Sequence, residues 1–301
     1  MRAVLFEHIK RAMAEDSSIF FLTADVGFNL VETMFQRFPE RAMNVGVAEQ
    51  NMVGIAAGLC NLGFKPVCYS YTNFLSERAF EQLRDDVCVH GYAPIFLGTT
   101  TGFDNAILGP THHSLDDIAV LKALPNMRIY SPSTSESVGL AIEEALAMSG
   151  EASFIRFTKN ELSEEREITS INRFLSENRG APVLVISHGH MAQNCVKALE
   201  AAPGSFSLFA MDRIKPLDEA VLAHLLKEFQ RIVVAEDNFK SGLYNSVCQF
   251  AVEKGIVPRC LLPLAVAERY DARIGDQHYL ESQQGLAPAQ IVDFLAKVTE
   301  L

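Results

Sequence analysis

Three stretches of this 301-residue chain combine residue types and positions that suit chemistry. Glu49 follows the apolar stretch 42–47 and begins a second apolar run, which predicts that a strand delivers it into the first turn of a helix. Phe74 follows another short apolar stretch, and His112 and His113 lie in a polar loop. Carboxylates and imidazoles are common proton donors and acceptors in active sites. Because the helix dipole alone favours a first-turn acid by about 0.3–1 kcal/mol, Glu49 indicates a site only together with its neighbours.

The elements that must position these residues alternate between strands and helices. In the first half, apolar runs and helical periodicity predict strands at 18–22, 42–47, 66–71, 94–98, 127–130 and 153–157, and helices at 2–14, 30–37, 48–60, 74–89, 114–121 (N-cap Ser114) and 135–148. In the second half, they predict strands at 183–187, 206–211, 232–236 and 259–264, and helices at 192–201, 218–229, 243–252 and 288–298. This alternation is typical of mostly parallel sheets covered on both faces, so we expect an α/β protein with two doubly wound domains. Residues 161–179 are rich in Glu, Ser, Arg and Asn and are predicted to connect the domains.

Ligands of open α/β sheets bind in the loops at the carboxyl ends of the strands. Here these loops contain acids, an aromatic ring and adjacent histidines. They contain no glycine-rich phosphate loop of the G-x-G-x-x-G or G-x-x-x-x-G-K-[ST] type, and no serine lies in a G-x-S-x-G elbow. His188 and His190 flank a glycine at a strand-to-helix turn, where a metal site is conceivable but a turn with polar side chains is favoured.

The composition excludes several classes of protein. Hydrophobic residues make up 49% and charged residues 21%, as in a globular protein with sizeable cores. A net charge of −11 argues against non-specific binding to nucleic acid or to anionic membranes. The six cysteines form no C-x-x-C pair and several have apolar neighbours, which indicates reduced thiols in a cytoplasmic protein. Residues 1–15 carry charges every few positions, unlike a signal peptide, and no stretch is suited to spanning a membrane.

Three motifs and their order resemble the pyrimidine-binding domain of the transketolase family: GVAEQNMVGIAAGL, YTNFLSERAFEQLRDDV and GPTHHSLDDIAVLKALPNMRIYSPS. The second half is similar to the C-terminal domain of that family in VLVISHGHMAQNCVKAL and IVVAEDNFKSGLYNSV. The resemblance covers essentially the whole chain. It implies a pyrimidine-binding domain at 1–162, a linker at 163–180 and a C-terminal domain at 181–301. Related members include 1-deoxyxylulose-5-phosphate synthase and the β subunits of 2-oxoacid dehydrogenases.

The resemblance implies thiamine diphosphate as the cofactor, accompanied by Mg²⁺. Glu49 matches the family glutamate that hydrogen-bonds a pyrimidine ring nitrogen and favours the imino tautomer, whose exocyclic nitrogen takes the thiazolium proton. Such a bond strengthens in a site without water. Phe74 matches the aromatic residue that stacks on the aminopyrimidine ring, and Phe80 is expected to line the same pocket or the core behind it. Asp25 and Val26 match the loop that borders the cofactor.

The resemblance also implies residues that bind the substrate. His112 matches the histidine that donates to a sugar hydroxyl or phosphate or moves a proton, a contribution of about 10²–10⁴-fold in rate. His113 is expected to support the loop. Arg2, Asn29 and Lys159 match positions that bind the phosphate of a sugar phosphate, although a solvated polar surface is the alternative for all three. Lys159 replaces an arginine, so a point charge replaces bidentate recognition.

Some positions depart from the family pattern. Classical transketolases use a histidine and an aspartate for donor recognition, at positions that correspond here to Thr100 or Thr101 and to Leu108. Glu77 lies where a further aromatic residue of the pocket is expected. These differences favour a modified, deoxy or branched sugar phosphate as the substrate.

Full-length family members place a diphosphate-binding domain, with a GDG motif followed by Asn, before the pyrimidine-binding domain. This sequence enters the pyrimidine-binding domain at Met1 and contains no GDG. The resemblance therefore implies the C-terminal subunit of a split transketolase that shares the cofactor with a separate N-terminal diphosphate-binding subunit, which supplies the Mg²⁺ ligands. We expect a heterotetramer on a homodimer core, and the small residues Gly54 and Gly58 suit close approach of another backbone.

Two alternatives remain open from the sequence. One is a β subunit of a 2-oxoacid dehydrogenase or a deoxyxylulose-phosphate-synthase-like enzyme, although the proline of GPTHHS favours a transketolase. The other is a non-catalytic assembly subunit, against which the joint presence of Glu49, Phe74 and His112 argues.

Overall fold

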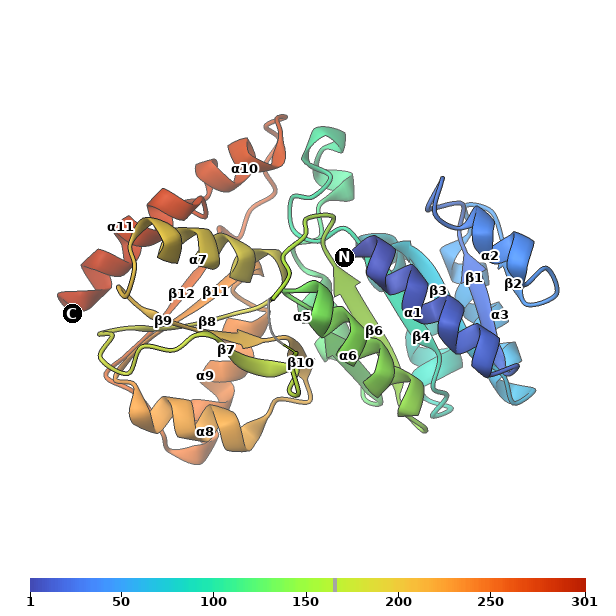
Figure 1. Ribbon diagram of the computed structural model, residues 1–301, viewed down its shortest axis with the longest axis horizontal. Helices are drawn as coiled ribbons and strands as arrows, with labels where there is room; N and C mark the ends of the chain where they lie inside the picture. Colours follow the sequence, from blue (N-terminus) through green and yellow to red (C-terminus); the bar gives the residue numbers. More distant parts are fainter. Residues whose placement is uncertain (165–166) are drawn as a thin grey trace. The chain divides into compact units, whose positions relative to one another are not determined.

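The computed structural model describes residues 1–164 and 167–301, which form two compact units. Unit 1 contains Met1–Thr100 and Val120–Glu167, and unit 2 contains Thr101–Ala119 and Ile168–Leu301. Each unit is built on a sheet whose strands are mostly parallel and are flanked by helices (Figure 1). The predicted α/β class with two doubly wound domains is confirmed.

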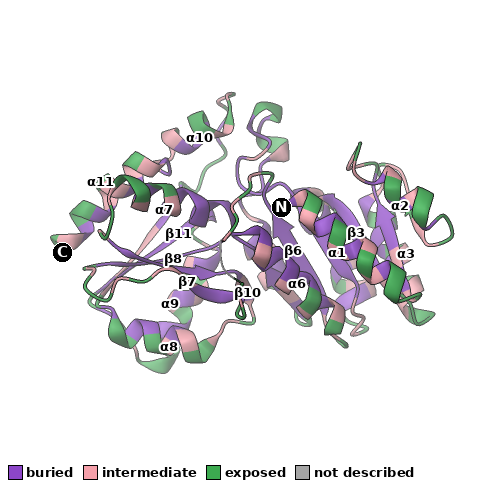
Figure 2. Ribbon diagram, in the orientation of Figure 1, coloured by how far each residue is buried: buried purple, intermediate pink, exposed green. Residues whose placement is uncertain are grey.

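The sheet of unit 1 has its strands in the order β5-β6-β4-β3-β1-β2, with parallel pairing throughout this run. The strands are β1 (Ile19–Thr23), β2 (Ala42–Asn44), β3 (Lys65–Tyr71), β4 (Ile95–Thr99), β5 (Met127–Tyr130) and β6 (Ala152–Phe157). Every residue of β4 and β6 is buried, and Figure 2 shows both strands as part of the buried interior. Nearly continuous apolar sequences form such strands because helices cover both faces of a parallel sheet.

Outside residues 74–89, the helices of this half of the chain begin and end close to their predicted positions, with one exception. They are α1 (Arg2–Glu15), α2 (Glu32–Arg37), α3 (Glu49–Asn61), α5 (Asp117–Lys122) and α6 (Ser135–Ala147). Helices α1 and α6 lie side by side (Figure 1), and α3 packs against β3. The exception is α5, because Ser114 is not its N-cap. The backbone of Ser114 instead pairs with Gly102 in an isolated antiparallel bridge.

Residues 74–89 do not form the single α-helix that the periodicity predicts. They form a π-helical turn η1 (Phe74–Arg78), the short helix α4 (Phe80–Gln82) and a second π-helical segment η2 (Leu83–Cys88). The predicted apolar face is nevertheless buried, at Leu75, Ala79, Leu83 and Val87. A π-helical turn accommodates an extra residue per turn without exposing that face, and such turns are frequent at functional sites.

The sheet of unit 2 has its strands in the order β12-β11-β8-β9-β7. The strands are β7 (Asn172–Ser176), β8 (Leu184–Ser187), β9 (Ser207–Met211), β11 (Arg231–Phe239) and β12 (Cys260–Val266). All pair in parallel except β7, which runs antiparallel to β9. Strand β7 was not predicted, since it falls within the expected connection 161–179; residues 165–166 of that connection lie outside the described residues.

Helices cover both faces of this second sheet (Figure 1). They are α7 (Gly189–Ala201), α8 (Glu219–Glu228), α9 (Leu243–Lys254), α10 (Gln277–Gln283) and α11 (Pro288–Thr299), and unit 2 also contains the short strand β10 (Arg213–Lys215). Helices α7 and α11 pack together, as do α8 and α9. Neither α10 nor β10 was predicted. Within residues 101–119, Phe103, Ala106 and Leu115 belong to the hydrophobic core of unit 2.

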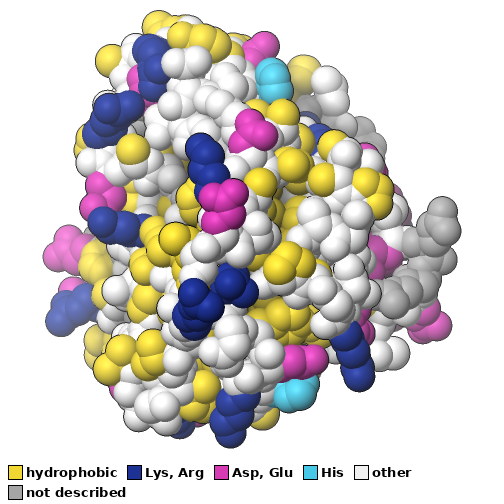
Figure 3. All heavy atoms as spheres, turned by 90° about the vertical axis from the view of Figure 1, so that its left-hand side faces the viewer, with side chains coloured by type: hydrophobic (Ala, Val, Ile, Leu, Met, Phe, Trp, Pro, Cys, Tyr) yellow, Lys and Arg dark blue, Asp and Glu magenta, His cyan; other side chains and the backbone are white. Residues whose placement is uncertain are grey.

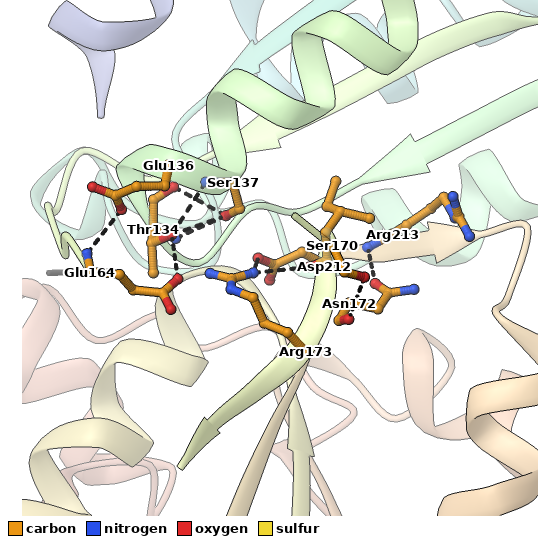
Figure 4. Close-up of polar contacts among 10 residues, drawn as sticks. Thr134, Glu136, Ser137, Glu164, Ser170, Asn172, Arg173, Asp212 and Arg213 are labelled. Atoms are coloured by element: carbon orange, nitrogen blue, oxygen red, sulfur yellow. Dashed lines mark hydrogen bonds and ion pairs between the residues drawn. The ribbon is translucent and has the colours of Figure 1, made fainter. Parts of the chain in front are cut away.

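Polar contacts at the start of α6 in unit 1 and between β7 and the residue after β9 in unit 2 are drawn in Figure 4. In unit 1, the Thr134 side chain accepts a hydrogen bond from the Ser137 amide at the start of α6, completing a capping box, and Thr134 also donates to Glu164 over 3.2 Å. In unit 2, Arg173 donates to Asp212 over 3.1 Å in an ion pair that is almost completely buried. A capping bond of this kind stabilises a helix by about 1 kcal/mol.

Among the described residues, no helix is both long and apolar enough to cross a bilayer. The face drawn in Figure 3 has hydrophobic side chains interspersed with acidic, basic and other polar ones.

Candidate active site

Neighbouring strands of unit 1 deliver several of the predicted site residues to one edge of the sheet. Strands β2, β1, β3 and β4 are adjacent and parallel, so their carboxyl ends lie together. The loops at this edge are hydrogen-bonded to neighbouring strands: the Val45 amide donates to the Thr23 carbonyl over 2.9 Å, and the Ala24 amide to the Tyr69 carbonyl over 3.3 Å. Glu49 follows β2 and Phe74 follows β3, at the edge where ligands of such sheets bind.

Glu49 is the first residue of α3 and is only 1% exposed. Its two carboxylate oxygens have separate partners. Ser70 Oγ donates to Oε1 over 3.0 Å, and Arg78 Nη1 donates to Oε2 over 2.6 Å. A carboxylate that is buried to this extent requires a charged or hydrogen-bonding partner to remain ionised. Strand β2 and the turn after it therefore place a fully buried acid at the expected ligand edge.

The ring of Phe74 is linked to Glu49 through the same arginine. The Arg78 guanidinium carbon lies 4.2 Å from the centroid of the Phe74 ring, in a cation–π contact. Tyr71 contacts Phe74 edge-on, with the ring centroids 5.5 Å apart. Both Phe74 and Arg78 belong to the π-helical turn η1, which packs against α3. Glu49, Arg78 and Phe74 thus form one continuous group of contacts, which we call the Glu49 cluster.

The loop after β1 is held in unusual backbone conformations. Asp25 and Asn29 adopt φ angles of 57° and 65°, in the left-handed region that non-glycine residues rarely occupy. Asn44 ties this loop to β2, since its side chain accepts from the Asp25 amide and donates to the Asp25 carboxylate, both over 3.0 Å. Val26 accepts from the Thr23 hydroxyl over 2.9 Å. Strain of this kind is characteristic of binding loops.

A further strained residue lies at the end of β4. Thr100 has a φ angle of 72°, an outlier for a β-branched residue, and its amide donates to the Phe157 carbonyl over 2.9 Å. Just before it, Gly98 is required by close packing, because a Cβ there would lie 2.7 Å from Thr72 Oγ1. Thr100 therefore occupies a constrained position at the carboxyl edge of the sheet, next to the strand that delivers Phe74.

The other residues predicted in unit 1 are spread around the same sheet. Burial raises the pKa of the Tyr69 hydroxyl, whereas the charge of Arg2, the first residue of α1, lowers it. Lys159 is exposed just after β6, and Phe80 is half-buried at the start of α4. Lys159 and Phe80 remain predictions, as does the assignment of Arg2 to a substrate phosphate.

The two adjacent histidines belong to unit 2 and differ in environment. His112 ends the 3₁₀ turn η4 (Pro110–His112), and its Nδ1 lies 3.0 Å from Thr111 Oγ1. His113 is buried edge-on against Phe103, with centroids 5.1 Å apart, and burial lowers its pKa. Thr101 is buried in the same loop, whereas Leu108 is about half-exposed.

The histidines at the turn before α7 do not form a metal site among the described residues. His190 Nε2 lies 2.8 Å from Glu281 Oε1, and His188 Nε2 lies 3.8 Å from Glu236 Oε2. Within the described part of the chain, no group of three or more His, Cys, Asp or Glu side chains is arranged to hold a metal ion. Both histidines of this turn thus lie beside a buried glutamate.

The Glu49 cluster has the chemistry to receive a planar nitrogen heterocycle. A buried carboxylate can bond a ring nitrogen, and the face of Phe74 can stack on the ring. In the structure Glu49 and Phe74 both contact Arg78, and Ser70 also donates to Glu49; sequence reasoning missed Ser70 and Arg78. Arg78 follows Phe74 by four residues, a spacing that places side chains on the same face of a helix and was the available signal.

Comparisons with known proteins identify relatives of both halves. Residues 1–164 match the family described as transketolase, pyrimidine binding domain, and residues 174–291 match transketolase, C-terminal domain. The chain is 31% identical over 293 residues to 1-deoxy-D-xylulose-5-phosphate synthase 1 of Geobacter metallireducens, covering 94% of this chain and 46% of that protein. It is 28% identical to the 6-deoxy-6-sulfo-D-fructose transketolase subunit SqwH of Clostridium sp. (strain MSTE9), covering 95% of this chain and 90% of that subunit.

Solved structures share the fold of the whole chain. A structure described as a split gene transketolase, inactive beta4 tetramer, superposes with a TM-score of 0.84 at 24% identity and covers 100% of this chain and 98% of its own. Transketolase from Leishmania mexicana superposes with a TM-score of 0.83 at 17% identity, and this chain covers 45% of it. The chain thus spans less than half the length of the synthases that it matches. At these identities, the structures show a common fold.

Proposed function

Because the chain belongs to the transketolase family, we propose that it is the subunit of a two-chain transketolase that carries the pyrimidine-binding and C-terminal domains. The proposed boundaries are 1–162 and 181–301, with a linker at 163–180. Support comes from two relatives of similar length, one named a transketolase subunit and one described as a split gene transketolase. The proposed reaction moves a two-carbon ketol unit between sugar phosphates.

The observation that carries the proposal is the buried carboxylate of Glu49, 1% exposed and in contact with the guanidinium that lies on Phe74. We assign Glu49 to a ring nitrogen of the thiamine diphosphate pyrimidine and Phe74 to the face of that ring. Asp25, Val26 and Phe80 are assigned to the border of the same pocket. When bound, this cofactor supplies a thiazolium that stabilises carbanions.

The residues of this chain would prepare the site in three ways. Glu49 would hold a proton at the pyrimidine nitrogen, and its burial would strengthen that bond because water does not compete. Phe74 would orient the ring by stacking. His112 would donate a hydrogen bond or a proton to the substrate. General acid–base catalysis of this kind raises the reaction rate by about 10²–10⁴-fold. Arg2, Asn29 and Lys159 are proposed to bind the substrate phosphate.

The proposed partner is a separate diphosphate-binding chain that supplies the Mg²⁺ ligands. The expected assembly contains two copies of each chain, in a cytoplasmic setting. The six cysteines are all free thiols, as expected for a reducing compartment.

A second function from the same family is also favoured by a specific observation. The synthase of Geobacter metallireducens is 31% identical across nearly the whole chain, so a deoxyxylulose-phosphate-synthase-like reaction, which starts from pyruvate, is the second candidate. The two candidates differ in the donor, which is a ketose phosphate for a transketolase and pyruvate for the synthase. A 2-oxoacid dehydrogenase β subunit would likewise act with a pyruvate-type donor.

The test is reconstitution of the complete complex with a diphosphate-binding chain encoded beside this one. The purified complex is assayed with thiamine diphosphate and Mg²⁺ against ketose phosphates, including deoxy and branched sugars, and against pyruvate. We expect ketol transfer, and Glu49→Gln should reduce turnover by orders of magnitude while light scattering shows an intact complex. Glu15→Gln, on the exposed end of α1, is the matched control. Pyruvate turnover would favour the second candidate, and unchanged turnover in Glu49→Gln would refute the proposed role.

A further inference from the structure

Arg78 makes two contacts that the proposed cofactor would also have to make. Its Nη1 donates to the buried Glu49 carboxylate over 2.6 Å, and its guanidinium carbon lies 4.2 Å from the centroid of the Phe74 ring. One planar group therefore bonds the acid and covers an aromatic face at the same time. Arg78 thus links Glu49 and Phe74, the two side chains that the proposed function assigns to the pyrimidine.

The chemistry of the two groups is closely similar. A guanidinium is a flat, delocalised array of nitrogens around one carbon that donates N–H to carboxylates and stacks on aromatic rings. An aminopyrimidine is also flat, carries nitrogens around a ring carbon, and uses its edge for hydrogen bonds and its face for stacking. A ring that bonds Glu49 and stacks on Phe74 would compete with the guanidinium for the two side chains that Arg78 contacts.

We propose that Arg78 is a resident substitute for the pyrimidine ring, which occupies the cofactor position in the free chain and leaves it when the cofactor binds. This inference rests on the proposed function. It makes Arg78 a determinant of cofactor affinity, since the cofactor has to displace the guanidinium from Glu49 and from Phe74 before it gains its own contacts with them.

The surroundings of Arg78 suit such an exchange. Its side chain is 43% exposed, whereas Glu49 is 1% exposed, so the guanidinium can move into solvent while the acid stays in place. Ser70 donates to Glu49 Oε1 over 3.0 Å, and Arg78 donates to the other oxygen, Oε2, so loss of the Arg78 contact would leave Oε2 for the incoming ring. In the free chain, Arg78 supplies the charged partner of the buried Glu49 carboxylate. A buried carboxylate without such a partner strongly destabilises a fold.

Two substitutions separate the consequences of this arrangement. Arg78→Met keeps an unbranched apolar stem and removes the competing charged group, so it should lower the Kd for thiamine diphosphate by about tenfold, the effect of one charge-assisted hydrogen bond. Arg78→Lys keeps the charge and loses the planar stacking group, so its Kd should fall between those of wild type and Arg78→Met. The matched control is Arg84→Met, because Arg84 is a more exposed arginine in the same segment and pairs with Asp85 over 2.6 Å.

The experiment measures equilibrium binding of thiamine diphosphate, with Mg²⁺, to the reconstituted two-chain complex by fluorescence titration. Thermal unfolding of the free full-length chain is recorded in parallel. We expect tighter binding and a lower Tm of the free chain for Arg78→Met, with neither change for Arg84→Met.

Equal or weaker binding by Arg78→Met, while wild type binds, would overturn the inference and leave Arg78 as a permanent support of Glu49. Failure of wild type and all variants to bind thiamine diphosphate would instead overturn the proposed function, and this inference with it. A Tm that is unchanged by Arg78→Met would also contradict the proposed role of Arg78 in the free chain.

Discussion

Glu49 is an acid in an environment that few acids occupy. It lies at the start of a helix, is almost fully buried, and has one neutral and one charged donor on its two oxygens. The helix dipole explains an acid at this position, but exposed acids benefit from the dipole without the cost of burial. Helix stability alone therefore does not explain the burial of Glu49, and this motivates the ligand proposed for it.

Removal of the Ser70 hydroxyl tests how strongly the Glu49 carboxylate depends on its donors. Ser70→Ala removes a buried hydrogen bond to a charged group and should lower the free energy of unfolding by about 1.5–3 kcal/mol, measured by urea denaturation. Ser205→Ala removes a partly buried bond to the neutral Ala202 carbonyl and should cost about 1 kcal/mol. Equal losses in the two variants would show that Glu49 does not need the bond.

At the scale of single residues, the sequence indicated Glu49 and Phe74 but not the residues that contact them. Glu49 and Phe74 were identifiable because each follows a short apolar strand and because the flanking motifs resemble a known family. Ser70 was hidden inside a strand, where a small polar residue has no distinctive pattern. Arg78 was hidden because a charged residue on a predicted helix is usually a solvated one, and only the packing of η1 against α3 turns it towards Glu49.

Helix α3 shows how an element can be suited to a partner. Gly54 and Gly58 are exposed, and a Cβ built on either would meet no atom within 4 Å, so neither glycine is required by the fold of this chain. Glycine inside a helix costs about 0.5–1 kcal/mol relative to alanine. Two exposed glycines four residues apart lower the stability of α3, but without side chains they let another chain approach the helix backbone closely.

Gly54→Ala should therefore have opposite effects on the free chain and on the assembly. We expect a higher Tm of the isolated chain, from a gain of up to about 1 kcal/mol, and weaker association with the partner or with a second copy. Circular dichroism measures the first effect and sedimentation velocity the second. Gly255→Ala is a useful contrast, because Gly255 has a φ of 65° and should lose stability. Unchanged association would argue against α3 as part of the interface.

At the scale of elements, the hydrophobic pattern predicted most strands and helices to within one or two residues. It missed β7 because Phe174 and Leu175 are the only apolar residues of that edge strand, too few for a periodic signal. It misassigned residues 74–89 because a π-helical turn buries the same apolar face as an α-helix. It placed α5 too early because the pairing of Ser114 with Gly102 depends on residues that are distant in sequence.

The stability of the whole molecule should depend on pH through a buried pair in unit 2. Burial alone would lower the pKa of His190, but its hydrogen bond to Glu281 and the nearby carboxylates of Asp104 and Asp237 raise it. A histidine with a raised pKa in the folded state binds its proton more tightly there than in the unfolded chain. Its contribution to stability is therefore complete below about pH 6.5, its unfolded pKa, and is lost as pH rises through the folded pKa.

His190→Gln measures this contribution directly. We expect the loss of unfolding free energy caused by the substitution to be larger at about pH 6 than at about pH 9, by urea denaturation. His224→Gln is the control, since His224 also lies beside a glutamate, Glu228, but is 74% exposed and should show little effect at either pH. A loss that grows as pH rises would contradict the direction of the His190 shift.

The family and fold of the whole molecule were predictable because they depend on long, repeated patterns and on motifs spread over the chain. The division into units was less predictable, because residues 101–119 pack into the core of unit 2 although they follow β4 of unit 1. The substrate was not predictable, because it depends on the residues proposed to contact it, such as His112 and Lys159, and on the proposed partner chain.

The most direct measurement compares the affinity of the reconstituted complex for thiamine diphosphate with its affinity for an analogue in which C–H replaces the pyrimidine nitrogen assigned to Glu49. Wild type should bind the analogue about tenfold or more weakly, since the analogue leaves a buried carboxylate without its bond. Glu49→Ala should lose most of this preference while the complex remains assembled. A wild-type complex that binds both molecules equally, or a Glu49→Ala complex that keeps the full preference, would contradict the assignment of Glu49.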